Sequence, residues 1–330
     1  MADIFECSPA EVVFTSGGTE ANNMALRGAT SALKSQGRHI ITSAVEHHSV
    51  LKTAEALGLD GFEITIVPVD AQGVIDPRLV AEAMRHDTIL VSVMHANNET
   101  GALQPVEEIG RVVRKRGVLF HTDAVQAFGK IEMGTVFDYA DMVTLAAHKI
   151  YGPQGAGALL VRRGTAFAPF MTGGHHEQGL RPGTENMAAL AGFAAAAQQA
   201  QAKLSDETKR IARLRDHFEA MLLQAIPHVS VNSRSAERVA NTASVCFDGI
   251  ESESALLHLD LLGICASAGS ACTTGETEPS HVLRAMGLSN LQAQSALRFS
   301  LGRSTTAGHV DTVAEALIGI IKKLRQMSSL

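Results

Sequence analysis

A lysine and an aspartate stand where two predicted strands end. Lys149 follows an apolar stretch and precedes a turn at Gly152-Pro153, and Asp123 follows another stretch one crossover unit upstream. Ligands of open α/β sheets bind at the carboxyl ends of the strands. Partial desolvation there would lower the pKa of a lysine as Schiff-base chemistry requires, and a carboxylate could pair with a protonated ring nitrogen. Taken singly, the lysine could equally be a surface residue and the aspartate a helix N-cap.

Other polar residues occupy similar positions. Gly17-Gly18-Thr19 begins a predicted helix, where backbone N–H groups and the helix dipole favour a phosphate. His47 and Asn98 each follow a predicted strand, so an imidazole could lie on a cofactor ring and an amide could donate to its oxygen. The pair His47-His48 could instead bind a metal, but adjacent side chains at a strand end point apart, which makes a metal the poorer interpretation.

An arginine in an apolar strand and a cysteine among small residues complete this set. Arg298, if it faces inward, needs either a substrate carboxylate or an internal ion pair. Cys272 lies in a run of Gly, Ser and Thr, which predicts a mobile loop. Cys246 and Cys265 fit small buried hydrophobic residues. Without a C-x-x-C pair, the four cysteines do not indicate a disulfide scaffold.

Composition limits the classes of function. The 330 residues carry a formal net charge of −6 and are 45% hydrophobic but only 4% aromatic. Such a chain is not expected to bind nucleic acid, which favours basic surfaces and stacking rings. No apolar run approaches the roughly 18 residues of a membrane span, and the N-terminus lacks a signal-peptide pattern. We therefore expect a cytoplasmic protein without a membrane or nucleic-acid partner.

Short β-branched stretches alternate with helical patterns, which predicts an α/β fold with a mostly parallel sheet. The predicted strands are His39–Ala44, Ile64–Val69, Ile89–Met94, Val118–Thr122, Met142–Ala146 and Ala158–Val161. The predicted helices between them are Glu20–Gln36, Pro77–His86 and Val106–Arg116. A helical stretch over 187–225 is expected to break near 204–206, where we place the boundary between a large domain, 1–203, and a smaller α+β domain, 204–330. The predicted elements of the second domain are a strand at Ala243–Phe247, a helix at Ser252–Leu262, a strand at Leu297–Leu301 and a closing helix.

The joint order of these motifs resembles the pyridoxal-phosphate-dependent cysteine desulfurases of the nitrogenase and iron–sulfur cluster assembly type. The resemblance runs over essentially the whole chain and includes FTSGGTEANN, EHHSV, NNETGALQPV, FHTDAVQ, AHKIYGPQGAGAL, GGHHEQGLRPGTEN, GSACTTGETEPSHVLRAMG and LRFSLGR. It implies the aspartate aminotransferase-like fold (type I) of class V aminotransferases. It also implies pyridoxal 5'-phosphate as cofactor, L-cysteine as substrate and a homodimer as the working form.

The resemblance assigns roles around the cofactor ring. Lys149 would hold the cofactor covalently through its amine, and His47 would stack on the ring and assist proton transfer. Asp123 would pair with the pyridine nitrogen and Gln126 with the phenolic oxygen. Asn98 would lie beside both the ring and the substrate.

It also assigns residues to the phosphate and the substrate. The backbone of Gly18 and the side chains of Thr19 and His148 would bind the phosphate. Thr184 would reach the phosphate of the partner subunit's cofactor. Arg298 would bind the carboxylate of L-cysteine.

By the same resemblance, Cys272 would be the nucleophile. Its thiolate would attack the substrate sulfur, leaving a persulfide on Cys272 and releasing alanine. The sulfur would then pass to an acceptor protein such as an iron–sulfur scaffold. No resident metal site is implied, apart from a transient contact of Cys272 with a cluster.

The chain departs from the family at two places. Ala146 stands where a serine commonly contacts the phosphate, although Thr144 is nearby. Family members also carry a further strand and a long helix before the equivalent of Phe14. We therefore expect a truncated chain with exposed apolar surface and impaired stability or activity.

Alternative functions remain open at this stage. One is a homologue that binds the cofactor or partners without catalysis. A related aminotransferase or selenocysteine lyase would keep Lys149 and Asp123 without needing Cys272. A metalloprotein built on the 14 histidines ranks last, because no spacing supports a site.

Overall fold

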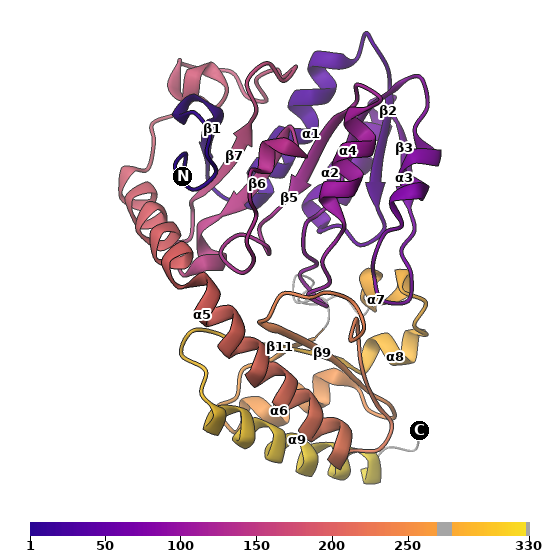
Figure 1. Cartoon of the computed structure of the whole chain (residues 1–330). Coiled ribbons are helices and arrows are strands. Elements are labelled where there is room, and N and C mark those ends of the chain that lie inside the picture. The colour runs from indigo at the N-terminus through magenta and orange to yellow at the C-terminus, as the bar shows by residue number, and fades with distance from the viewer. Residues whose placement is uncertain (269–278, 328–330) are drawn as a thin grey trace. The chain divides into compact units, whose positions relative to one another are not determined.

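The computed structural model describes residues 1–268 and 279–327, which divide into two units (Figure 1). Unit 1 comprises Met1–Pro68, Ile75–Asn97 and Gln104–Leu204. Unit 2 comprises Val69–Val74, Asn98–Leu103 and Ser205–Leu330. Unit 2 thus takes two short stretches from the first third of the chain in addition to the residues beyond 204.

Unit 1 is built on a seven-stranded sheet with the strand order β1-β7-β6-β5-β4-β2-β3. Its strands are β1 Val12–Thr15, β2 His39–Ser43, β3 Glu63–Val67, β4 Thr88–Ser92, β5 Leu119–Asp123, β6 Met142–Ala146 and β7 Gly157–Val161. β3, β2, β4, β5 and β6 are joined by parallel pairings, whereas β7 is antiparallel to both β6 and β1. The predicted mostly parallel sheet is confirmed. The carboxyl ends of β2, β4, β5 and β6 consequently lie at one edge of the sheet.

Helices pack on this sheet through apolar faces. The α-helices of unit 1 are α1 Gly18–Leu33, α2 His48–Leu59, α3 Pro77–Ala83 and α4 Val106–Arg114, and its 3-10 helices are Pro9–Glu11, Val136–Asp138, Ala147–Ile150 and His176–Gly179. α1 contacts β4, β5, β6 and β7. Met24 and Leu26 of α1 are fully buried in one core with Ile40 and Leu90. This burial of large apolar side chains holds the start of α1 against the sheet.

The helix α5 runs without interruption from Met187 to Ala225, a length of 39 residues. The predicted break near 204–206 is therefore wrong. Ser205 and Asp206 are exposed, whereas Leu204 beside them is buried. Poor helix formers on a solvent-facing side cost only about 0.7 kcal/mol or less each, so the packed face decides the outcome.

Unit 2 has a four-stranded antiparallel sheet in the order β10-β11-β9-β8. Its elements are β8 Val229–Val231, β9 Thr242–Phe247, α6 Ser252–Asp260, β10 Ser267–Ala268, α7 His281–Ala285, α8 Asn290–Gln294, β11 Ala296–Ser300 and α9 Ala307–Met327, together with the second half of α5. Phe218 of α5 meets Phe299 of β11 edge to face, with ring centroids 4.9 Å apart. This contact lies in the apolar core of the unit.

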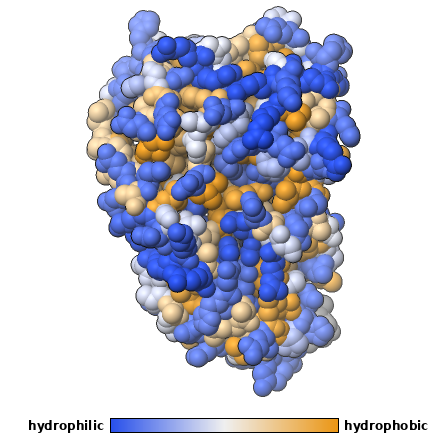
Figure 2. Space-filling model, viewed as in Figure 1, coloured by the Kyte–Doolittle hydropathy of each residue, from blue (hydrophilic) through white to orange (hydrophobic). Residues whose placement is uncertain are grey.

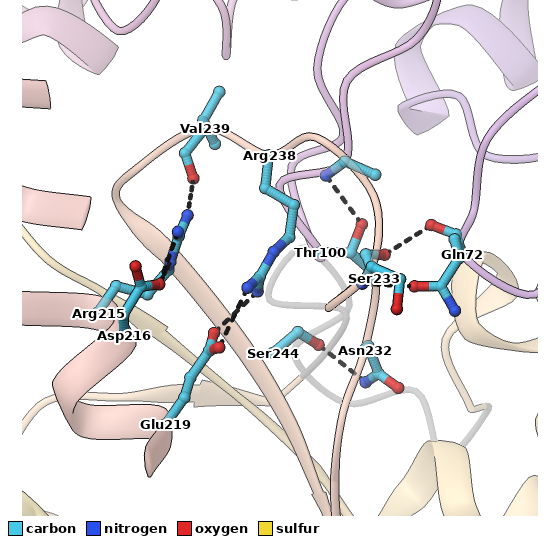
Figure 3. Close-up of polar contacts among 12 residues, drawn as sticks. Gln72, Thr100, Arg215, Asp216, Glu219, Asn232, Ser233, Arg238, Val239 and Ser244 are labelled. Atoms are coloured by element: carbon cyan, nitrogen blue, oxygen red, sulfur yellow. Dashed lines mark hydrogen bonds and ion pairs between the residues drawn. The ribbon is translucent and has the colours of Figure 1, made fainter. Parts of the chain in front are cut away.

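A hydrogen bond and a backbone bridge tie the two short early stretches to the later residues of unit 2, and Figure 3 shows the contacts of Gln72 and Arg238. Ser233 Oγ donates to the backbone oxygen of Gln72 at 2.8 Å. Ala102 forms an antiparallel bridge with Arg238, whose guanidinium donates twice to the buried carboxylate of Glu219. The bridge fixes the stretch that carries Asn98.

The surface of the protein presents both polar and apolar residues. Figure 2 shows a largely hydrophilic face with apolar residues exposed among the polar ones.

Of the cysteines, Cys246 is buried as expected, but Cys265 is exposed. The expectation of burial for Cys265 is wrong because it follows the turn after α6, where Leu262 and Gly263 are exposed as well.

Candidate active site

Asp123 ends β5 and is buried. Its Oδ2 accepts a hydrogen bond of 2.7 Å from Asn22 Nδ2, and its Oδ1 accepts one of 3.0 Å from the backbone N–H of Val125. Burial raises the pKa of Asp123, while these hydrogen bonds and the charges of His47 and Lys149 oppose the rise. A cationic group placed against this carboxylate would therefore stabilise its ionised form.

His47 is the N-cap of α2 and is half-buried. Its Nδ1 accepts a hydrogen bond of 3.1 Å from the backbone N–H of Ser49 and lies 2.8 Å from Ser49 Oγ. Ser49 Oγ accepts a hydrogen bond of 2.8 Å from Asn22 Nδ2, the same amide that donates to Asp123. Burial lowers the pKa of His47, so the imidazole is neutral near pH 7.

The N-terminus of α1 has no side-chain cap. A Cβ on Gly18 would come within 2.8 Å of Val125 Cγ2, so glycine alone fits where the helix approaches the turn after β5. Thr19, next in the chain, is exposed. The N–H groups of a helix's first turn and the helix dipole favour an anion, and the phosphate-binding role expected for Gly18 and Thr19 stays a prediction.

The 3-10 helix Ala147–Ile150 follows β6 and carries His148 and Lys149, both exposed. Lys149 interacts electrostatically with His47 and with Asp123. The structure thus brings together the predicted lysine, imidazole and carboxylate, which come from three strand ends. Burial and then the charge of Lys149 lower the pKa of His148. The lowered pKa expected for Lys149 itself stays a prediction.

Gln126 lies in the turn after β5. Its Oε1 accepts a hydrogen bond from Lys130 Nζ, four residues further along the chain. Because the amide oxygen is engaged in this way, the Nε2 group is the end of Gln126 that suits a phenolic oxygen.

Ala146 and Thr144 lie on the same side of β6, facing Gly18. A Cβ built on Gly18 would be 3.8 Å from Ala146 Cβ and 3.8 Å from Thr144 Cγ2. The hydroxyl of Thr144 is 3.0 Å from Nε2 of the buried His121. Since the methyl of Thr144 faces Gly18 and its hydroxyl is bound elsewhere, Thr144 does not replace the serine missing at position 146.

Asn98 and Arg298 come together within unit 2. Arg298 Nη1 donates a hydrogen bond of 2.9 Å to the backbone oxygen of Asn98. Arg298 Nε is buried and has no hydrogen-bond partner among the described residues, which suits a substrate carboxylate. Glu99 accepts a hydrogen bond from Ser280 Oγ. Burial raises the pKa of Glu99 to about 7, opposed by Ser280 and Arg298.

Thr184 lines a separate hollow in unit 1. This cavity of about 230 Å³ also includes Thr15, Ser16, Glu177 and Arg181 in its wall. Arg181 is held by an ion pair of 2.7 Å with Glu20 in the first turn of α1. Thr184 is therefore not part of the Asp123 cluster, and its expected role toward a partner subunit stays a prediction.

The remaining expectations concern Cys272, metal ions and membrane spans. Cys272 falls in 269–278, outside the described residues. Within the described ranges, no group of three or more His, Cys, Asp or Glu side chains is placed to hold a metal ion. No helix in the part of the chain that the structure describes is long and apolar enough to cross a membrane.

Two residues of the cluster, Asn22 and Ser49, were missed by the sequence analysis. The available signal was a polar residue on the buried face of α1: Asn22 is 1% exposed and its neighbours Ala21 and Met24 are fully buried. A buried amide requires hydrogen-bond partners, which here are Ser49 and Asp123.

Comparison with known proteins identifies the family of this chain. Residues 1–313 match the model of the family described as aminotransferase class-V. The chain belongs to this family. It is 44% identical over 328 residues to a cysteine desulfurase of Nostoc sp., which covers 99% of this chain and 82% of the relative. The family that the sequence predicted is thereby confirmed.

Solved structures agree with the family. A NifS-like protein superposes with a TM-score of 0.91 at 35% identity, covering 98% of this chain and 86% of the other. SspA in complex with cysteine superposes with a TM-score of 0.79 at 36% identity, covering 91% and 84%. The predicted type I fold is confirmed.

Class-V aminotransferases and cysteine desulfurases use pyridoxal 5'-phosphate, and the residues of unit 1 fit it. Burial raises the pKa of the Asp123 carboxyl, and a cation such as a protonated pyridine nitrogen would lower it again. The uncapped start of α1 at Gly18 suits the phosphate. The exposed amine of Lys149 suits the aldehyde carbon.

Proposed function

We propose that the protein is a cysteine desulfurase that converts L-cysteine to L-alanine and transfers the sulfur to Cys272. The observation that carries the proposal is the cluster of Asp123, His47 and Lys149 at three strand ends. A cysteine in the sequence Gly-Ser-Ala-Cys favours desulfuration over transamination.

Each residue of the cluster has a physical task. When bound, pyridoxal phosphate supplies an electron sink for the electrons left when the substrate loses its α-proton. Lys149 would hold the cofactor, and Asp123 would stabilise a positive charge on its ring nitrogen. His47 would lie against the ring as a neutral imidazole. Arg298 binds the substrate carboxylate through its guanidinium.

The sulfur step needs no external oxidant. The thiolate of Cys272 attacks the substrate sulfur, an S–S bond forms and the substrate C–S bond breaks. The electron pair of the broken bond goes to carbon, which takes up a proton and leaves as the methyl group of alanine. Cys272 then carries a persulfide for an acceptor protein, for which we propose an iron–sulfur scaffold.

Mass spectrometry after alkylation tests this function. The purified chain is incubated with pyridoxal phosphate and L-cysteine, beside Cys272→Ser and the matched variant Cys265→Ser. We expect a one-sulfur adduct on Cys272 and free alanine in the wild type and in Cys265→Ser, and neither in Cys272→Ser. Cysteine consumption without an adduct would favour another reaction of the family, and cofactor binding without turnover would favour a homologue that only binds it.

We further propose a homodimer in the cytoplasm. Thr184 lies in the wall of an open hollow rather than in the Asp123 cluster, which suits a contact with a second subunit's cofactor. The described cysteines Cys7, Cys246 and Cys265 are free, and a persulfide carrier needs a reducing compartment. Analytical ultracentrifugation tests the dimer: a monomer that is fully active would contradict it.

A further inference from the structure

A continuous hydrogen-bonded chain joins the imidazole of His47 to the carboxylate of Asp123. The amide nitrogen of Asn22 is its centre: Nδ2 has two hydrogens, and the structure directs one to Ser49 Oγ and the other to Asp123 Oδ2, at 2.8 and 2.7 Å. Ser49 Oγ lies 2.8 Å from His47 Nδ1. Asn22, Ser49 and Asp123 are all buried.

The direction of each hydrogen bond in this chain follows from its donors. Asn22 donates to Ser49 Oγ, which leaves the hydroxyl hydrogen of Ser49 to point toward His47 Nδ1. The backbone N–H of Ser49 also donates to Nδ1, at 3.1 Å. Since Nδ1 faces two donors, it must be the unprotonated nitrogen, and the ring proton of the neutral imidazole lies on Nε2.

We propose that Asn22 and Ser49 are positioning residues that hold His47 as the neutral tautomer with its proton on Nε2 and connect it to Asp123. In this state His47 presents an N–H donor at Nε2. Protonation at Nδ1 would place an N–H against the backbone N–H of Ser49, so the imidazolium is disfavoured. This inference rests on the proposed function only for the role of His47 toward the cofactor. Its test does not require turnover.

Charges around His47 act in both directions. The carboxylate of Asp123 raises its pKa, whereas burial and the charges of His48 and Lys149 lower it. An added charge alone would therefore also shift the titration of His47, and the experiment must separate charge from hydrogen bonding.

Nitrogen-15 NMR of the histidine rings tests the proposal on the full chain with its cofactor loaded. His47→Gln identifies the His47 signals. We expect wild-type protein to show hydrogen on Nε2 and none on Nδ1. A proton on Nδ1 in the wild type would overturn the proposal, whatever the variants do.

The variant Asn22→Asp replaces the donor at the centre of this network with an acceptor of the same size. One oxygen of the aspartate accepts from the Ser49 hydroxyl, which turns a lone pair of Oγ toward Nδ1 and favours the imidazolium. Its other oxygen shares a proton with Asp123, because two carboxylates in contact do not both ionise. Asn23→Asp is the matched control, because Asn23 donates to the backbone oxygen of Thr19 and takes no part in the hydrogen bonds between His47 and Asp123. We expect the pKa of His47 to rise by at least one unit more in Asn22→Asp than in Asn23→Asp. Adding Ser49→Ala to Asn22→Asp should remove most of this difference, and equal shifts in the two aspartate variants would contradict the proposal.

Discussion

The guanidinium of Arg238 and the carboxylate of Glu219 form a two-fold hydrogen-bonded ion pair inside unit 2, with bonds of 2.8 and 3.1 Å. The two side chains are only 5% and 4% exposed. Figure 3 shows this pair. Arg238 also forms a backbone bridge to Ala102. The pair therefore stabilises the stretch 98–103, from which Asn98 meets Arg298.

Glu219→Gln should destabilise the protein strongly, because it leaves the charge of Arg238 buried without a counter-charge. The expected loss in the free energy of unfolding is about 3–5 kcal/mol. Urea unfolding measures it, with Glu107→Gln as control. Glu107 pairs with Arg111 on an exposed face of α4, so its loss should be at most about 1 kcal/mol. Equal effects of the two substitutions would show that the buried pair carries no special weight.

Glu46 gives the protein a pH-dependent stability. It is buried, and burial raises its pKa to about 8 against hydrogen bonds from Ser43 and Met94. The folded state therefore binds this proton more tightly than the unfolded chain, whose carboxyl titrates near 4.5. Stability is present in full below that value and is lost as the pH rises toward 8, by at most about 1.4 kcal/mol per pH unit.

Glu46→Gln removes this loss, because an amide oxygen accepts the same two hydrogen bonds and has no proton to lose. Relative to wild type, the variant should gain stability between pH 5 and pH 8. Urea unfolding at a series of pH values, without added cofactor, measures the gain. Glu55→Gln, on the exposed side of α2, should leave the pH profile unchanged. A Glu46→Gln curve parallel to wild type would refute the raised pKa.

Local patterns predicted the features that depend on one segment at a time. The apolar β-branched stretches gave the central strands, and the residues directly after them gave Asp123, His47 and Lys149. Features that depend on two distant segments were missed. Glu219 and Arg238 are hydrogen-bonded although they are 19 positions apart in the sequence, and Asn22 and Asp123 although they are 101 apart. The residues next to each of them in the sequence do not indicate which partner it has. The wrong break in α5 has the same origin, since packing of Leu204 outweighs the local preference of Ser205 and Asp206.

Arg298→Lys should weaken the binding of L-cysteine while leaving the cofactor in place. Lysine keeps the positive charge but loses the planar fork and the Nε–H that has no partner among the described residues. We expect KM for cysteine to rise at least ~10-fold, which corresponds to about 1.4 kcal/mol, with an unchanged visible spectrum. Arg303→Lys is the control, because Arg303 pairs with Glu207 instead. A KM equal to wild type would exclude Arg298 as the carboxylate ligand.

Ala146→Ser should tighten cofactor binding. The side chain of residue 146 faces the uncapped start of α1 at Gly18, where the phosphate is expected, so a hydroxyl there adds one donor. One hydrogen bond is worth about 1 kcal/mol, or roughly a five-fold lower Kd for pyridoxal phosphate. Titration of the cofactor-free protein followed by absorbance measures this Kd.

Thr144→Val distinguishes this effect from a general change at β6. The hydroxyl of Thr144 binds His121, which burial keeps neutral by lowering its pKa to about 3. Its loss should therefore reduce the free energy of unfolding by about 1–3 kcal/mol and leave the Kd for the cofactor unchanged. If Thr144→Val instead weakened cofactor binding while Ala146→Ser had no effect, the phosphate would be bound by Thr144, and the orientation of its methyl group toward Gly18 would be incorrect for the loaded protein.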